Sequence, residues 1–271
     1  MTSTFSIGDR ETEPITLSAL EFDVLWEHLR LGALPLVVKV PSPGKTTEER
    51  ARLEEQAWAA LEGRGLGRPV ELNPDIEDIL SVLAKADREV DARAYAGGTH
   101  VRVLAAATGE QAGVAELCDG SVRLRHASAT ALPAAALAAL PALAAGPGRS
   151  VTLRTADFEA AARGAAGIRE GFHKSLLEQG IRADDASALT EMIKDVGATG
   201  NFGAAARDKF GRRRRADRVV SFFDTEDGRY VQIRRPAPDG TQWTTISPAD
   251  PRNLTHHVDE LLAEIVREAT P

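Results

Sequence analysis

Apolar residues recur at helical spacing in three stretches near the start of the chain, at 16–32, at 46–63 and from residue 73 onward. Each stretch opens with side chains that can accept hydrogen bonds from the free N–H groups of a helix's first turn. Gly32 and Gly63 end the first two stretches. We therefore predict three amphipathic helices. The expected capping residues are Ser18 with Glu21, Thr46 with Glu49, and Asn73 before Pro74.

The run from Leu34 to Val40 has a different pattern. It is short, apolar and rich in β-branched residues, and glycine and proline bound it. This combination is typical of a buried strand, so we predict one here, ended by Pro41 and Pro43.

From Arg88 onward the apolar period changes from the helical value to two, which predicts strands with two different faces. Further strands are predicted at 100–105, 113–117 and 121–127. The connections contain Gly97-Gly98, Thr108-Gly109 and Asp119-Gly120, and they are too short for crossover helices. The sheet is therefore predicted to be an antiparallel meander. An alanine-rich helix with a kink, within 129–145, is expected to cover one of its faces.

The second half of the chain shows the same kinds of pattern. We predict helices starting at Thr155, at 169–179, at 185–195 and at 253–268. Strands are predicted at 150–154, 201–206, 218–224, 229–235 and 241–247.

The two halves resemble each other in the order of these elements. The segment 101–140 and the segment 218–262 both contain strands, an Asp-Gly turn, another strand and a helix. The turns, Asp119-Gly120 and Asp239-Gly240, lie 120 positions apart. We predict an α+β fold with a pseudo-twofold internal duplication, formed as one domain over 1–271 from halves at about 15–146 and 150–268.

Charge and cysteine content narrow the functional classes. The chain has 33 basic and 40 acidic residues, for a net charge of −7, which argues against general attraction to nucleic acid or anionic lipid. The single cysteine, Cys118, cannot form an intramolecular disulfide. We see no signal peptide and no apolar span long enough for a membrane, and we expect a cytoplasmic protein.

Several strings along the chain resemble the EspG family. They are "ITLSALEFDVLWEHLRLGALPLVVKVPSPG", "TEERARLEEQAWAALEGRGL", "REVDARAYAGG", "RVVSFFDTEDGRYVQIRR" and "TQWTTISPADPRNLTHHVDELL". The resemblance runs from about Ile15 to Glu268 and lies in patterning rather than in a chemical signature.

The resemblance implies a function as well as a fold. EspG proteins are cytosolic chaperones of actinobacterial type VII secretion systems, with a central, mostly antiparallel sheet and two flanking helical bundles. They use the sheet and the C-terminal bundle to bind the helical tip of exported PPE proteins, which form PE–PPE heterodimers. It also implies no cofactor and no catalysed reaction. A WXG-like helical client is an alternative, and we expect a monomer or a weak homodimer.

The C-terminal strands offer the best candidate surface for such a partner. In the strand 229–235, Val231 and Ile233 are predicted to face the core, while the residues between them face the other way. Mixed aromatic, arginine and small polar groups are typical of a protein interface. The alternative is that a helical bundle covers this second face, above all at Phe223 and Trp243. The candidate partner-binding residues are Ser221, Phe223, Tyr230, Gln232, Arg234 and Trp243.

The basic segment 209–218, which contains the run Arg212–Arg215, supports a second hypothesis. Arg213 and Arg214 are candidates for contacts to an acidic client, or to the phosphates of a nucleic acid in the alternative function. Phe210 is the one aromatic residue beside the run, and a charged run between strands is more often a solvated loop.

No pattern in the sequence indicates an enzyme. His256 and His257 are adjacent on a predicted helix, so their side chains diverge by about 100° and cannot share a metal as an i, i+4 pair can. No nucleophile elbow, phosphate-binding loop or zinc-protease motif occurs. We therefore expect no catalytic residue and no metal.

Overall fold

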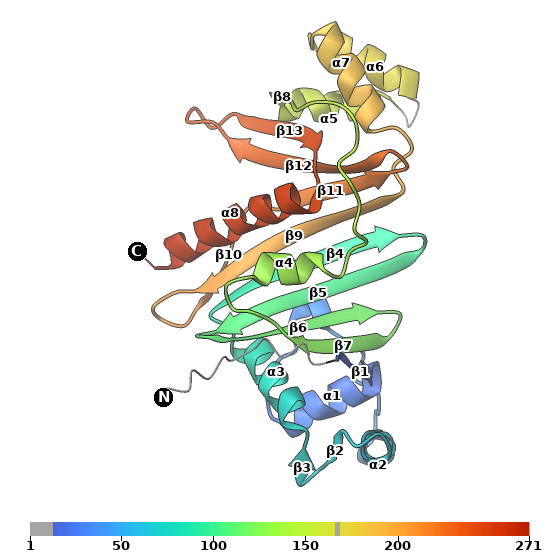
Figure 1. The fold of residues 1–271 in the computed structure, drawn as a ribbon, viewed down its shortest axis with the longest axis vertical. Helices are drawn as coiled ribbons and strands as arrows, with labels where there is room; N and C mark the ends of the chain where they lie inside the picture. Colours follow the sequence, from blue (N-terminus) through green and yellow to red (C-terminus); the bar gives the residue numbers. More distant parts are fainter. Residues whose placement is uncertain (1–12, 166–168, 271) are drawn as a thin grey trace, which may run out of the picture.

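The computed structural model describes residues 13–165 and 169–270, and most of their strands form one large sheet (Figure 1). The strand order is β1-β7-β6-β5-β4-β9-β11-β12-β13-β8, every neighbouring pair is antiparallel, and β10 also pairs with β9. The strands are β1 (Ile15–Ser18), β4 (Arg88–Ala96), β5 (Thr99–Thr108), β6 (Gln111–Cys118), β7 (Ser121–His126), β8 (Val151–Arg154), β9 (Ala198–Arg207), β10 (Arg213–Arg215), β11 (Val220–Thr225), β12 (Gly228–Pro236) and β13 (Gln242–Pro248). A separate hairpin joins β2 (Gly67–Arg68) to β3 (Glu71–Leu72).

Helices gather at both ends of the sheet and across its middle (Figure 1). One bundle contains α1 (Ala19–His28), α2 (Thr47–Gly63) and α3 (Pro74–Lys85), together with the 3-10 turn η1 (Leu36–Val38). The other contains α5 (Thr155–Gly164), α6 (Arg169–Glu178) and α7 (Ala183–Met192). The short α4 (Leu132–Leu137) and the long α8 (Pro251–Ala269) lie across the centre of one sheet face. The predicted α+β class with two flanking bundles is confirmed.

The same order of elements occurs in both halves: a short strand, three helices, a four-stranded meander and a helix. The meander β4 to β7 in the first half corresponds to β9, β11, β12 and β13 in the second, and β4 and β9 meet at the sheet centre. Asp119-Gly120 joins β6 to β7, and Asp239-Gly240 lies between β12 and β13. Both glycines have a positive φ, of 77° and 83°, which a turn of this kind requires. An origin by duplication stays a prediction.

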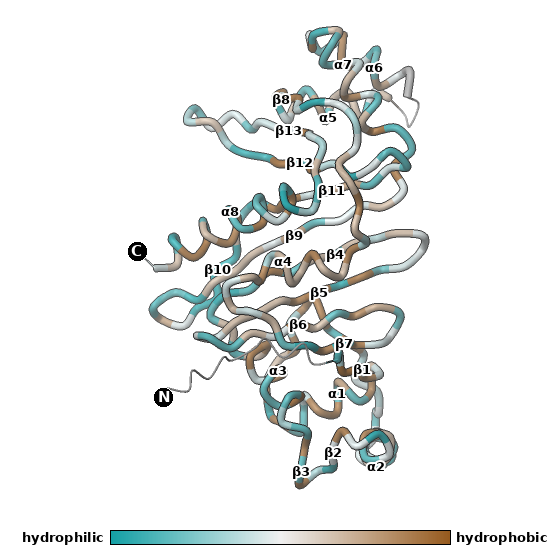
Figure 2. Tube along the Cα trace, viewed as in Figure 1, coloured by the Kyte–Doolittle hydropathy of each residue, from teal (hydrophilic) through white to brown (hydrophobic). Residues whose placement is uncertain are grey.

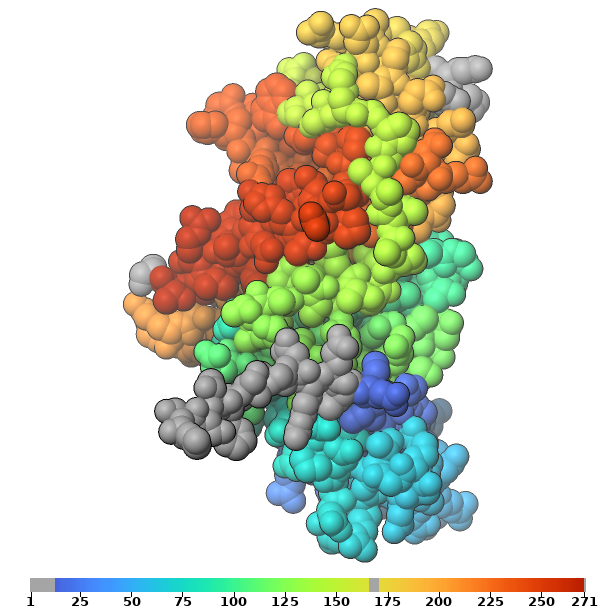
Figure 3. Space-filling view, in the orientation of Figure 1, coloured from blue at the N-terminus to red at the C-terminus, as the bar shows by residue number. Residues whose placement is uncertain are grey.

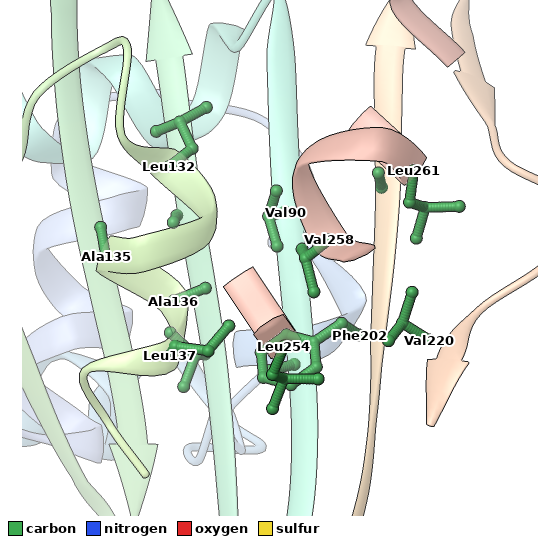
Figure 4. Close-up of a cluster of buried hydrophobic side chains, with 14 of the residues drawn as sticks. Val90, Leu132, Ala135, Ala136, Leu137, Phe202, Val220, Leu254, Val258 and Leu261 are labelled. Atoms are coloured by element: carbon green, nitrogen blue, oxygen red, sulfur yellow. The ribbon is translucent and has the colours of Figure 1, made fainter. Parts of the chain in front are cut away.

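Three hydrophobic clusters divide the two faces of the sheet. On the first face, alternate residues of the central strands pack under α4 and α8. Figure 4 shows this cluster, including Val90, Phe202 and Val220 from the strands and Leu254, Val258 and Leu261 from α8. On the second face, one cluster lies under the N-terminal bundle and another under the C-terminal bundle. Within 13–165 and 169–270, therefore, no helix covers the middle of the second face.

The chain between α4 and β8 crosses the first face as an extended segment (Figures 1 and 3). Ala145 forms a parallel bridge with Arg229, and the Gly146 N–H donates to the Arg229 carbonyl at 3.1 Å. The buried Arg229 side chain binds both carboxylate oxygens of Asp224, at 2.7 and 2.8 Å, and the Pro141 carbonyl at 3.1 Å. This arginine therefore links the connecting segment to the β11–β12 hairpin.

Several local predictions are confirmed and others are wrong. The capping boxes at Ser18 and Thr46 form with both hydrogen bonds each. The run 34–40 is not a strand: it contains η1, where the Val38 N–H donates to the Pro35 carbonyl at 3.1 Å, and Val37 and Val38 are buried. The alanine-rich helix ends at Leu137 and does not continue to Ala145. The basic segment is not a plain loop, because 213–215 form the strand β10.

Candidate functional site

The uncovered middle of the second face contains a row of polar side chains that crosses five strands. Directly paired residues on neighbouring antiparallel strands share a face, so this row follows from the register of the sheet. At its ends the row meets Leu117 and Ile246, which belong to the clusters under the two bundles. In spatial order its members are Arg102 (β5), Arg93 (β4), Asn201 (β9), Ser221 (β11) and Gln232 (β12). We call this set the polar row.

All five side chains of the polar row are at least partly exposed. The Ser221 hydroxyl donates to the Asn201 side-chain oxygen at 2.6 Å. Arg93 and Arg102 lie directly opposite each other, which is unfavourable for like charges unless an anion is near. Asp91 compensates Arg93 at 2.9 Å. The row therefore combines hydrogen-bonding amides, a hydroxyl and positive charge on a surface bounded by two helical bundles.

Beside the row, β10 places its arginines over β9. Arg213 and Arg215 reach across the small residues Gly203 and Ala205 to the carboxylates of Glu89 and Asp91 on β4. The Asp91 carboxylate is 4% exposed, and Arg93 and Arg215 both bind it. The hydrogen bond to Asp91 raises the pKa of Arg215 above its ordinary value, against the opposing effect of burial. These ion pairs anchor the β9–β10 hairpin to the sheet.

The tip of this hairpin, 208–212, is mostly hydrophilic, and Phe210 is its large apolar residue (Figure 2). Phe210 is 69% exposed, and Lys209 and Arg212 hold their charges 5.5 and 5.2 Å from its ring centre. The backbone N–H of Arg212 donates to Asp208 and lowers the pKa of that carboxyl below its ordinary value. The predicted site residue Arg214 lies on the other side of β10 from Arg213, with its side chain 4.0 Å from Asp208.

Two of the predicted partner-binding residues are buried. Phe223 and Tyr230 stack at a centroid distance of 5.2 Å inside the cluster under the C-terminal bundle. The Tyr230 hydroxyl donates to the Pro147 carbonyl at 3.0 Å, and burial raises the pKa of this hydroxyl. In this structure the two side chains pack under the C-terminal bundle, and Tyr230 also binds the segment between α4 and β8. For Phe223, this is the alternative given above, in which a helical bundle covers the residue.

The other predicted residues lie on two different faces. Ser221 and Gln232 belong to the polar row, and Arg234 continues the same face toward α5, where it binds Glu159 at 2.9 Å. Trp243 pairs directly with Arg235, which alternates with Arg234, so Trp243 lies on the first face and is 39% exposed. The structure thus brings Ser221, Gln232 and Arg234 together and separates Trp243 from them. Sequence reasoning missed Arg93, Arg102 and Asn201, because pairing across the sheet centre is not visible in a single strand's pattern.

Other chemistry is sparse in the described residues. Within 13–165 and 169–270, no three histidine, cysteine or carboxylate side chains are placed to hold a metal ion. His256 and His257 both approach Glu260 on the surface of α8. Burial raises the pKa of the Cys118 thiol, which lowers its reactivity. In the same ranges, none of the helices has the length and apolar character needed to cross a membrane.

Comparisons with known proteins agree with this architecture. A family model described as the EspG family matches residues 18–260. Among solved structures, the chain is similar to the Mycobacterium tuberculosis type VII secretion system chaperone EspG5 in its complex with the PE25–PPE41 dimer. That match has a TM-score of 0.71 and 18% identity, and it covers 95% of this chain and 97% of EspG5. No curated protein sequence matches the chain.

Proposed function

The chain belongs to the EspG family, and we propose that it is a type VII secretion chaperone that holds a helical, exported client against the uncovered middle of its sheet. The observation that carries the proposal is the polar row of Arg102, Arg93, Asn201, Ser221 and Gln232 between two helical bundles. A protein partner can satisfy these groups and pack against the bundle edges at the same time.

The kind of client is proposed by analogy with a similar chaperone of this family. The similar chaperone EspG5 was solved with the PE25–PPE41 dimer. We propose a client of the same kind for this chain, a PPE-like helical protein in a PE–PPE heterodimer, or a WXG-like helical protein. The binding is non-catalytic and needs no cofactor, because shielding an apolar helical tip requires contact surface and no bond chemistry. The chaperone acts in the cytoplasm, before export, as a monomer or a weak homodimer.

The first experiment is a tagged pull-down from the cytosol of the native host, with a nuclease wash and mass spectrometry of the retained proteins. Recovery of a small helical protein encoded with type VII components is the expected result. Recovery of nothing, or of nucleic acid that the nuclease removes, would contradict the chaperone function.

A variant pair then tests the surface. Ser221→Lys places a long charged side chain in the centre of the polar row, and we expect it to weaken the client complex about tenfold or more. Ser128→Lys, in the exposed loop after β7, is the matched control and should leave the affinity unchanged. Arg234→Glu tests the continuation of this face toward α5. An unchanged affinity in both the Ser221 and Arg234 variants would remove this face as the binding site.

A further inference from the structure

A groove lies on the second face between the N-terminal bundle and the β9–β10 hairpin, with a volume of about 410 Å³. Its walls come from the segment around η1, the end of α3, and the strands β4, β9 and β10. It is separate from the C-terminal bundle. We call it the β10 groove.

The wall of the β10 groove that β4, β9 and β10 form has a net positive charge. Four arginines line it, at positions 93, 207, 213 and 215, against two carboxylates, Glu89 and Asp91. The two carboxylates already bind Arg93, Arg213 and Arg215. Among the residues that the structure describes, Arg207 donates to two backbone carbonyls, those of Ala86 at 2.8 Å and Gly211 at 2.9 Å. The groove therefore carries an excess of two positive charges and favours an anionic group in its occupant.

The opposite wall is apolar. Leu34, Pro35 and Leu36 form a lip along it, and the Leu36 side chain is 79% exposed. The same 3-10 turn buries Val37 and Val38 in the core of the N-terminal bundle. Because these neighbours fix the turn, Leu36 is presented to solvent at little conformational cost on binding. An exposed large apolar side chain held in this way is typical of an anchoring contact.

We propose that the β10 groove is a second contact site for the helical client, and that the client fills it with a large apolar side chain next to an aspartate or glutamate. The apolar side chain packs against Leu36, and the carboxylate lies near Arg207 and Arg213. The assignment rests on the proposed chaperone function. It adds an N-terminal contact to the polar row, and it specifies the chemistry of the client segment that reaches it.

Continuity with the polar row is the reason for assigning this groove to the same client. Arg93 belongs to the row and also lines the groove, and Asp91 lies two residues from it on the same face of β4. A client that covers Arg93 reaches the groove by extending along β4 to Asp91 and Glu89, without leaving the sheet surface. An unrelated partner would have to share Arg93 with the client.

Site-specific photo-crosslinking in the native host tests the assignment. A photoreactive amino acid is placed at position 36, at position 221 in the polar row, or at position 70 as a control. Val70 is 87% exposed in the β2–β3 turn, and it matches Leu36 in size and exposure but lies outside the groove. The protein captured from each position and its crosslinked peptide are identified by mass spectrometry.

The expected result is that positions 36 and 221 capture the same helical client, that position 70 does not, and that the peptide from position 36 contains an apolar residue beside a carboxylate. Capture from 221 but not from 36 would overturn the groove assignment and leave the chaperone function standing. Capture from neither position would contradict both. A client peptide at position 36 without acidic residues would overturn the charge assignment.

Affinity measurements with the purified client give a second readout. Leu36→Glu removes the apolar contact and adds repulsion toward a carboxylate, so it should weaken binding about tenfold or more. Val70→Glu should change the affinity by less than about twofold, since it makes the same substitution away from the groove. Equal affinities for the two variants would overturn the proposal.

Discussion

The guanidinium of Arg215 lies over strand β9 and binds the carboxylate of Asp91 on the next strand, with Nη2 3.1 Å from Oδ1. Gly203 lies between them, and a Cβ atom at that position would be 2.1 Å from Arg215 Nη2 and 2.9 Å from Asp91 Oδ2. The absence of a side chain at residue 203 is therefore what allows an arginine to bridge from β10 to β4.

Gly203→Ala tests this relationship. The added methyl group displaces Arg215 and leaves the buried Asp91 with Arg93 as its remaining partner, so we expect a loss of about 1–3 kcal/mol in the free energy of unfolding. Urea unfolding measures it. Gly63→Ala is the control, because nothing lies within 4 Å of its added Cβ. Equal stabilities of the two variants would show that the bridge contributes nothing.

Arg229 supports a second prediction, because it is 2% exposed and binds Asp224 through two nitrogens. Arg229→Met leaves Asp224 without its partner and should lower the free energy of unfolding by about 3 kcal/mol. The control is Arg235→Met, whose pair with Glu260 is half-exposed and should contribute less than about 1 kcal/mol. Thermal or denaturant unfolding of both variants gives the comparison.

A substitution at Tyr230 distinguishes a role of this residue in stability from a role in binding the client. Tyr230→Phe removes the hydroxyl that donates to the Pro147 carbonyl and keeps the ring, so we expect a stability loss of about 1 kcal/mol. Because the ring is buried, the affinity for the client should stay the same in a binding titration. A large loss of affinity without loss of stability would show that the Tyr230 hydroxyl contacts the client, as the sequence-based interpretation expected.

The nucleic-acid alternative is tested by a mobility-shift assay with short DNA and RNA at roughly 150 mM salt. Arg213 and Arg215 bind Glu89 and Asp91, and the chain has a net charge of −7, so we expect no tight complex. Tight binding that weakens steeply as salt rises would support the alternative. The double variant Lys209→Ala, Arg212→Ala would then show whether the hairpin tip carries it.

His257 on α8 predicts a pH dependence of stability. Burial lowers the pKa of His257 below its ordinary value, with His256 and Arg235 acting in the same direction and the hydrogen bond to Glu260 opposing them. The unfolded chain therefore takes up the proton at higher pH than the folded chain. The contribution of His257 to the free energy of unfolding is complete above about pH 6.5, and it is lost as the pH falls below that value.

His257→Gln should reduce that dependence. We expect the stability of the wild-type protein to fall more steeply than that of the variant between about pH 7 and pH 5, as measured by urea unfolding at each pH. Parallel curves for the two proteins would show that His257 does not contribute.

The sequence determined the local elements well where local chemistry decides them. The capping boxes at Ser18 and Thr46 and the turns at Asp119-Gly120 and Asp239-Gly240 depend on neighbouring residues, and the structure has them where they were predicted. The period-two pattern from Arg88 onward corresponds to β4, whose Val90 and Ala92 belong to the buried cluster of the first face. The antiparallel meander followed from connections too short for crossovers.

The tertiary structure decided whatever depends on residues far apart in the chain. The apolar run at 34–40 has the composition of a buried strand but contains η1, because burial alone does not select backbone conformation. Tyr230 and Gln232 have the same alternation in the sequence, but the C-terminal bundle covers only the first. The polar row and the β10 groove arise where β4 meets β9, strands about 110 residues apart in the chain. That pairing is set by the packing of the whole sheet, so no local pattern could reveal which side chains it brings together.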